Sequence, residues 1–258
     1  MKIYEYGNKD ASTILIQPID ERDVTSLESE VAEIKKCVPD SFLLVAFTVN
    51  DWNKDLSPWK APAVFGKDDF GDGAQGTLDE ILKYCKDSSK TYIIGGYSLA
   101  GLFALWAACQ TDLFYGVAAA SPSMWFPGFL EYVERNDEQQ VTVGNTDIDA
   151  CQEIDSGNCV EGSLCGRQEI KIGEEKSLSG CRIKSKLVYL SVGDKEEKAR
   201  NPVLASVGDR IRKAYELFRS EGIDSVLEIN EGNHFRDADL RTAKAFAWVI
   251  HQTAKSRN

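Results

Sequence analysis

A serine set among small residues limits the fold of this chain more than any other feature. The segment Gly-Gly-Tyr-Ser-Leu-Ala-Gly at 95–101 follows a β-branched and aromatic run (91–94), typical of a buried strand, and precedes an Ala- and Leu-rich run (99–109), typical of a buried helix. A sharp strand-to-helix turn needs small residues, because larger side chains would collide with the neighbouring strand or helix. We therefore predict that Ser98 presents its hydroxyl above a sheet, beside a helix N-terminus.

The rest of the chain alternates strand and helix patterns in the same way. This predicts an α/β fold with a mainly parallel central sheet and helices on both faces. With 258 residues, of which 43% are hydrophobic, we expect a single domain over 1–258. Strands are expected at 2–6, 13–17, 41–49, 91–95, 114–120, 186–192 and 225–230, and helices at 23–37, 77–85, 99–109, 129–134, 204–218 and from 237. The helix at 77–85 is given its start by a T-x-x-E capping box of Thr77 and Glu80.

Residues 137–185 interrupt the alternation. This segment is polar and lacks a long apolar period, so we expect an insertion or lid at about 137–185 and not a second domain with its own core. Its cysteine spacing lacks the paired C-x2–4-C of structural zinc sites, which favours free thiols over the alternatives of disulfides or a metal. The cysteines in this segment are Cys151, Cys159, Cys165 and Cys181.

The charge of the chain restricts its partners. A net charge of −11 argues against nucleic acid or an anionic membrane, but it does not argue against a small neutral molecule. Residues 1–7 lack the pattern of a signal peptide, and no uncharged apolar run approaches the roughly 18 residues that span a bilayer. We therefore expect a cytoplasmic location, while the oligomeric state stays open.

The small number of histidines limits which residue could activate Ser98 as a nucleophile. A serine hydroxyl is a poor nucleophile near neutral pH and needs an adjacent base, normally an imidazole oriented by a carboxylate. The chain has two histidines. His251 lies within the last predicted helix, where a structural role is expected, whereas His234 lies in a loop after a strand and can reach over the strand ends. We predict Ser98 as nucleophile and His234 as base, with no metal or organic cofactor.

The acid is expected between these two residues along the chain, because enzymes with a nucleophile at such a turn follow the order Ser, acid, His. The segment 191–197 follows the penultimate strand at that place. Glu196, three residues past Gly193, is favoured. Asp194 is the alternative, and Glu197 or no acid at all remains a third reading.

An oxyanion hole needs two backbone N–H donors. One is expected from Leu99, directly after the nucleophile. The other is expected from the loop after strand 41–49, where Trp52 and Asp51 are both candidates. The large aromatics Trp59 and Trp125, together with Trp52, are candidates to line a substrate pocket, although such residues are more often part of the core.

Taken together, these segments resemble the serine-esterase branch of the α/β-hydrolase superfamily, which includes enterochelin-esterase-like, feruloyl-esterase-like and esterase-D-like enzymes. The segments that carry the resemblance are 51–59, 95–105, 121–129, 193–197 and 232–234. It covers nearly all of 1–136 and 186–255. Two features depart from the family pattern: Ala100 replaces the second glycine of the usual G-x-S-x-G, and 137–185 has no counterpart.

The resemblance implies an α/β-hydrolase fold and a serine hydrolase that cleaves a small-molecule carboxylic ester through an acyl-enzyme. Ser98 and His234 correspond to the family's nucleophile and base, with a carboxylate near Glu196. An acyltransferase or thioesterase with the same residues is one alternative. The other is a non-catalytic binding module that uses the inserted segment as its partner surface.

Overall fold

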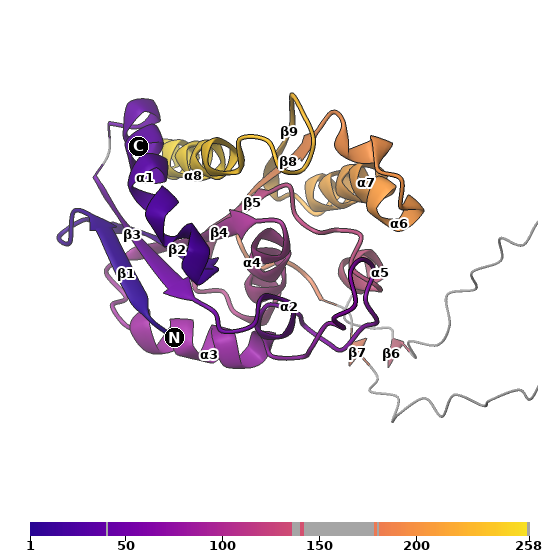
Figure 1. The fold of residues 1–258 in the computed structure, drawn as a ribbon. Helices are drawn as coiled ribbons and strands as arrows, with labels where there is room; N and C mark the ends of the chain where they lie inside the picture. The colour runs from indigo at the N-terminus through magenta and orange to yellow at the C-terminus, as the bar shows by residue number, and fades with distance from the viewer. Residues whose placement is uncertain (40, 136–139, 142–177, 180, 257–258) are drawn as a thin grey trace, which may run out of the picture.

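A seven-stranded sheet forms the centre of the computed structural model, which describes residues 1–39, 41–135, 140–141, 178–179 and 181–256 (Figure 1). The strand order is β1-β3-β2-β4-β5-β8-β9, and only β1 runs antiparallel to its neighbour within this sheet. The strands are β1 (Ile3–Gly7), β2 (Thr13–Ile19), β3 (Phe42–Thr48), β4 (Thr91–Tyr97), β5 (Phe114–Ala120), β8 (Leu187–Gly193) and β9 (Asp224–Asn230). The predicted mainly parallel α/β fold is confirmed.

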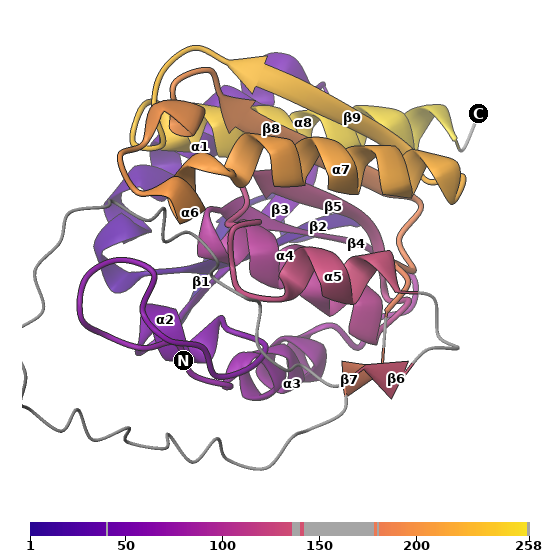
Figure 2. The same ribbon diagram turned by 90° about the vertical axis from the view of Figure 1, so that its right-hand side faces the viewer.

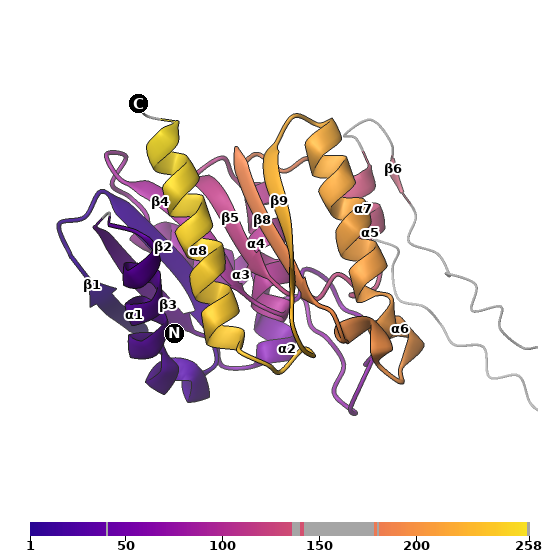
Figure 3. The same ribbon diagram turned by 90° about the horizontal axis from the view of Figure 1, so that it is seen from above.

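Helices cover both faces of this sheet. On one face lie α1 (Leu27–Cys37) and α8 (Ala238–Lys255), and α8 crosses the middle strands when the sheet is seen from above (Figure 3). On the other face lie α3 (Ala74–Tyr84), α4 (Leu99–Gln110) and α7 (Val207–Ser220) (Figure 2). Shorter helices connect these elements: η1 (Glu21–Ser26), α2 (Trp52–Asp55), α5 (Phe129–Glu134), η2 (Glu196–Lys198) and α6 (Pro202–Ala205).

Burial explains why the sequence forms these elements. Strands β2, β3 and β8 are buried at every position, because helices cover them from both sides, and this accounts for their continuous apolar runs. Successive residues of β2 point to opposite faces: Ile14 packs in the core layer under α4, and Leu15 in the layer under α8. In α4 every residue except Gln110 is buried, as expected of a helix that is apolar all round.

The predicted start of α3 is wrong by one turn. The helix begins at Ala74, and Thr77 lies buried inside it. The Thr77 hydroxyl donates to the Asp55 carbonyl at 2.7 Å, a contact between segments, and it does not cap its own helix. A local T-x-x-E pattern cannot distinguish these two uses of a threonine.

Most of 137–185 lies outside the described residues, including Cys151, Cys159 and Cys165, so the inserted segment stays a prediction. Its described ends pair as the short antiparallel strands β6 (Gln140–Val141) and β7 (Leu178–Ser179). Cys181 is buried. Among the described residues, every helix is too short or too polar to span a bilayer.

The connections reverse direction between β2 and β4. The chain leaves β2 through α1 to reach β3 on one side, and it returns through α3 to β4 on the other side of β2. Pairing between the two strands ends at Ile16 and Ile94, before either strand ends. Ligands of open α/β sheets bind at such a reversal, outside the carboxyl ends of the strands. Ser98 follows β4 at this place.

Candidate active site

Ser98 is held in a backbone conformation that serine rarely adopts. It has φ 56° and ψ −118° and stands between β4 and α4. Its N–H donates to the Ala120 carbonyl at 3.1 Å, and its own carbonyl accepts from the N–H groups of Ser123 (3.0 Å) and Leu102 (3.1 Å). Strain of this kind costs about 1–3 kcal/mol and persists only where the surroundings fix it. These bonds fix the turn that exposes the hydroxyl.

The packing of this turn explains why Ala100 can stand where the usual pattern has glycine. A Cβ on Gly96 would lie 2.6 Å from the Ala100 Cβ, which is closer than two carbons can approach. Gly96 lacks this atom and thus leaves the space that the Ala100 methyl group fills. Ala100 is therefore accommodated in this turn because Gly96, which packs against its methyl group, has no side chain.

The structure brings Ser98, His234 and Glu196 together. The His234 Nε2 lies 2.9 Å from the Ser98 Oγ, and the His234 Nδ1 lies 2.8 Å from the Glu196 Oε2. The Ser98 Oγ also lies 3.1 Å from the hydroxyl of Ser123, a buried residue of segment 121–129 for which the sequence predicts no catalytic role. This is the geometry in which an imidazole can remove a serine proton while a carboxylate holds the ring.

The competing carboxylates have other partners. Asp194 accepts the N–H of Gly232 at 2.6 Å and thereby holds the loop that carries His234. Glu197 pairs with Arg212 on α7. Of the three acidic residues at 194–197, Glu196 is the one that contacts the imidazole.

Glu196 is buried and strongly hydrogen-bonded. Its Oε1 accepts from the Gly193 N–H at 2.7 Å and from the Ser121 hydroxyl at 2.9 Å, which leaves Oε2 for His234. Burial raises the pKa of this carboxyl, but the hydrogen bond and charge of His234, together with those two donors, outweigh it and bring the pKa below its usual value. The carboxylate is therefore ionised at neutral pH.

A buried arginine from α8, missed by the sequence analysis, organises this region. The Arg241 side chain is 2% exposed, and its Nη1 lies 3.1 Å from the Glu196 Oε1 and 2.9 Å from the Tyr97 hydroxyl. Its Nη2 donates to the carbonyls of Glu231 (3.1 Å) and Asn233 (3.2 Å), in the loop that leads to His234. One guanidinium thus ties Glu196 to the loop that carries His234.

We expect Arg241→Met to lower the free energy of unfolding by about 3–5 kcal/mol, because it leaves the buried carboxylate of Glu196 without its cation. Urea unfolding followed by circular dichroism measures the loss. The exposed Arg236, paired with Glu231 at 2.9 Å, supplies the control: Arg236→Met should cost about 1 kcal/mol or less. Equal losses in the two variants would contradict a special role for Arg241.

The backbone near Ser98 offers two N–H donors. Leu99 is the first residue of α4 and Trp52 the first of α2, positions where an N–H has no partner within its own helix. The N–H of Asp51 donates to the Asp55 carboxylate at 3.0 Å. Since that donor is already used, Trp52 is the better placed of the two alternatives.

A cavity of about 810 Å³ adjoins Ser98 and His234. Its walls are largely apolar, and three cationic side chains also line it. The aromatic residues are Trp52, Phe65, Trp125 and Phe235, and the cationic residues are Arg22, Lys195 and Lys198. Trp52 and Trp125, two of the predicted pocket residues, both line this cavity.

The expectation that Trp59 lines a substrate pocket is wrong for this cavity. Its indole N–H donates to the Pro127 carbonyl at 2.9 Å, and its ring stacks on Phe129 and meets Phe126 and Tyr132 edge-on. The side chain fastens the 51–59 loop to α5 and the segment before it.

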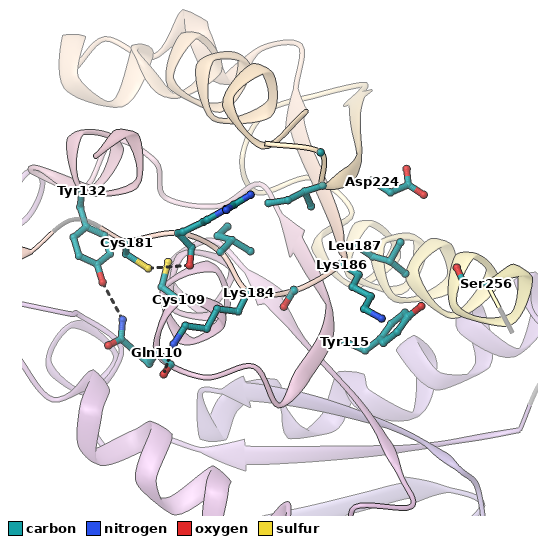
Figure 4. Close-up of a pocket in the computed structure, with 15 residues that line it drawn as sticks. Cys109, Gln110, Tyr115, Tyr132, Cys181, Lys184, Lys186, Leu187, Asp224 and Ser256 are labelled. Atoms are coloured by element: carbon teal, nitrogen blue, oxygen red, sulfur yellow. Dashed lines mark hydrogen bonds between the residues drawn. The ribbon is translucent and has the colours of Figure 1, made fainter. Parts of the chain in front are cut away.

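A larger cavity, of about 1010 Å³, lies at the amino-terminal ends of β5 and β8 (Figure 4). Figure 4 shows Cys109 and Cys181 side by side there, with Lys184 and Lys186 from the segment leading into β8. No histidine lines it among the described residues. Ligands of α/β sheets gather at the opposite ends of the strands, so this cavity is not the candidate active site.

Comparisons with known proteins identify the fold. No protein-family model and no curated protein matches the sequence. Solved structures do match. The siderophore hydrolase EstA from Aspergillus nidulans is 12% identical with a TM-score of 0.58, and the match covers 97% of this chain and 94% of that one. An IroE-like serine hydrolase from Shewanella oneidensis is 13% identical with a TM-score of 0.63, covering 96% and 75%. This chain has the α/β-hydrolase fold.

A third structure, Est1E from Butyrivibrio proteoclasticus, is 14% identical with a TM-score of 0.52, covering 98% of this chain and 94% of that one. In an α/β-hydrolase fold the turn after the central strand carries the nucleophile when the protein is a hydrolase. Ser98 stands at that turn.

Proposed function

We propose that this α/β-hydrolase-fold protein is a serine esterase that cleaves a small-molecule carboxylic ester through an acyl-enzyme. The observation that carries the proposal is the hydrogen-bonded chain from Ser98 Oγ through His234 to Glu196, with distances of 2.9 and 2.8 Å. Structurally similar proteins whose names describe siderophore and serine hydrolases support the same reaction class. The apolar cavity at Ser98 suits the body of an organic ester.

In the acylation half, His234 Nε2 takes the proton of Ser98 as Oγ attacks the ester carbonyl. The N–H groups of Leu99 and Trp52 stabilise the oxyanion that forms. His234 then gives its proton to the leaving alkoxide, and the alcohol departs. Glu196 stays ionised throughout and keeps the proton of the neutral imidazole on Nδ1.

In the deacylation half, His234 removes a proton from water, which attacks the acyl-Ser98 carbonyl. The second oxyanion occupies the same two N–H donors. Collapse of this intermediate returns the proton to Ser98 and releases the carboxylic acid. None of these steps calls on a metal or an organic cofactor.

The proposal includes the cytoplasmic location expected from the sequence. Cys37, Cys85 and Cys109 are free thiols. Free thiols are usual in reducing compartments, which supports this location.

A fluorophosphonate probe, which phosphonylates activated serines, tests the proposal. We expect the wild-type protein to be labelled and Ser98→Ala to be unlabelled. His251→Ala is the matched control, because this exposed histidine lies far along α8, and it should be labelled like the wild type. Folded wild-type protein that takes up no probe would rule the esterase out, and labelling of Ser98→Ala would assign the nucleophile to another residue.

A further inference from the structure

A second and smaller cavity also reaches Ser98. It lies between the end of β2, the start of α1 and the start of α8, and it has a volume of about 290 Å³. Ser98 and His234 both line it, so a group bound there is adjacent to the reacting hydroxyl. We call it the carboxyl-lined cavity, because Asp23, Glu30 and Asp239 all contribute to its wall.

Two buried polar side chains of this cavity have unpaired atoms. Gln17 is 6% exposed and Glu30 is 2% exposed. The Gln17 Nε2 donates to the Glu30 Oε2 at 3.2 Å, which leaves Gln17 Oε1 and Glu30 Oε1 without a hydrogen-bond partner among the described residues. Buried polar atoms are nearly always paired, and an unpaired acceptor is costly. The cavity thus suits a ligand group that donates hydrogen bonds.

The charge of the cavity has one sign. Asp23 and Asp239 lie at its opening, where each is exposed on one side and covered by the cavity wall on the other, and neither lysine nor arginine lines it within the described part of the chain. The nearest guanidinium on η1, that of Arg22, is paired with Asp20 at 2.9 Å. A cation is therefore the missing complement of these carboxyls.

The pKa values agree with this picture. The pKa of Glu30 is raised to about 8: burial is the main cause, the hydrogen bond from Gln17 opposes it, and the charges of Asp239 and Asp23 add to it. Burial is also the main reason why the pKa values of Asp23 and Asp239 lie above their usual range. A bound cation favours the ionised form of all three groups.

An organic cation fits this cavity better than a metal ion. No cluster of three or more histidine, cysteine or acidic side chains within the described residues is compact enough to hold a metal. The position at the reversal between β2 and β4 is also where sheets of this type take organic ligands.

We propose that the carboxyl-lined cavity is a subsite for a primary ammonium group of the ester substrate. Gln17 and Glu30 accept its hydrogen bonds at the buried end, and Asp23 and Asp239 attract it at the opening. The inference rests on the proposed esterase function and adds a substrate class to it: esters that carry an amine-bearing arm.

Binding of n-hexylammonium to the Ser98→Ala protein, compared by calorimetry with binding of 1-hexanol, tests the subsite without catalysis. We expect the ammonium to bind at least about tenfold more tightly, since a charge-assisted hydrogen bond is worth at least that factor. At pH 9, where Glu30 is ionised, adding Glu30→Gln should remove most of the preference, and Asp239→Asn should reduce it. Affinities of the two probes within threefold of each other would overturn the proposal.

Two pairs of esters test the subsite during turnover, and each pair compares an ammonium ester with an uncharged ester of similar length. In one pair the charge is on the acyl part, and in the other it is on the alcohol. The pairs are p-nitrophenyl 6-aminohexanoate with p-nitrophenyl heptanoate, and 6-aminohexyl butyrate with heptyl butyrate. The pair whose charged part enters the carboxyl-lined cavity should respond. In that pair we expect the ammonium ester to have a kcat/KM at least about tenfold higher than that of its uncharged partner.

The preference should rise between pH 6 and 9 as Glu30, with its pKa of about 8, loses its proton. Asp23, Asp239 and the Arg22–Asp20 pair are the other charged groups around the cavity. His234, which also lines it, acts on Ser98 in both members of an ester pair. An alkylammonium, with a pKa of about 10.4, stays charged. In Glu30→Gln the preference should no longer rise with pH.

Glu28→Gln is the matched control, because this exposed residue lies on the same helix outside the cavity, and it should leave the preference unchanged. Hydrolysis of p-nitrophenyl acetate separates the two proposals. If the wild type cleaves it but shows no ammonium preference in either pair, the subsite is wrong and the esterase stands. If it cleaves no ester at all, the esterase is wrong, and the calorimetry alone decides the subsite.

Discussion

Replacing His234 by alanine should lower kcat for ester hydrolysis by about 10⁶-fold, a loss that only removal of Ser98 itself should match. Loss of the base alone has about this effect in a serine protease with the same three residue types. The physical reason is that Ser98 has one imidazole within reach, at 2.9 Å, and without it the hydroxyl keeps its proton at neutral pH. Initial rates with p-nitrophenyl acetate, over a range of concentrations, give kcat directly.

The effects of the two residues should not add. Because Ser98 and His234 act in one step, Ser98→Ala combined with His234→Ala should be no slower than either single variant. His251→Ala should keep the wild-type kcat. A His234→Ala protein that is folded and retains more than about a hundredth of the activity would contradict the assignment of the base.

The second large effect concerns the acid. Glu196→Gln should lower kcat by about 10⁴-fold, because an amide at this position donates to the imidazole and stabilises the wrong tautomer. The neighbouring Glu197→Gln is the control: Glu197 pairs with Arg212 on the surface and should be replaceable without loss of activity. The measurement is again kcat, with the pH held near 7, where the Glu196 carboxylate is ionised.

If Glu196→Gln and Glu197→Gln have equal activity, His234 needs no carboxylate to orient it and the site works as a pair. In that case the loop must be held by its other contacts, chiefly the bond from Gly232 to Asp194 and those from Arg241. Arg241→Met would then cost more activity than Glu196→Gln.

The sequence predicts the local parts of the site well. The turn around Ser98 can be predicted because the features that define it are local in the sequence: small side chains, a strand pattern before it and a helix pattern after it. The sequence favours Glu196 but does not decide between the candidate acids, because Asp194, Glu196 and Glu197 all follow the same strand. Each of the three carboxylates has a different partner: Gly232, His234 and Arg212, respectively. These partners lie 15 to 38 residues away along the chain.

Other features depend wholly on distant contacts. From the sequence, Arg241 has the pattern of an ordinary charged residue on an amphipathic helix. The neighbouring residues do not indicate that its guanidinium contacts Tyr97 and Glu196. Trp59 shows the opposite error, because its place in a loop after a central strand predicted a pocket, whereas its indole is used to hold that loop against α5. Gln17 and Glu30 likewise look like ordinary strand and helix residues until their unpaired atoms are seen.

The position of α8 makes the site depend on a helix that follows all of its other parts along the chain. Every strand of the sheet, the Ser98 turn and the His234 loop precede this helix. If α8 is not docked on the sheet, Glu196 lacks the Arg241 guanidinium, and the loop that carries His234 lacks the two hydrogen bonds from that group. A local opening of this one helix would therefore loosen Glu196 and the His234 loop together, while the strands stay paired.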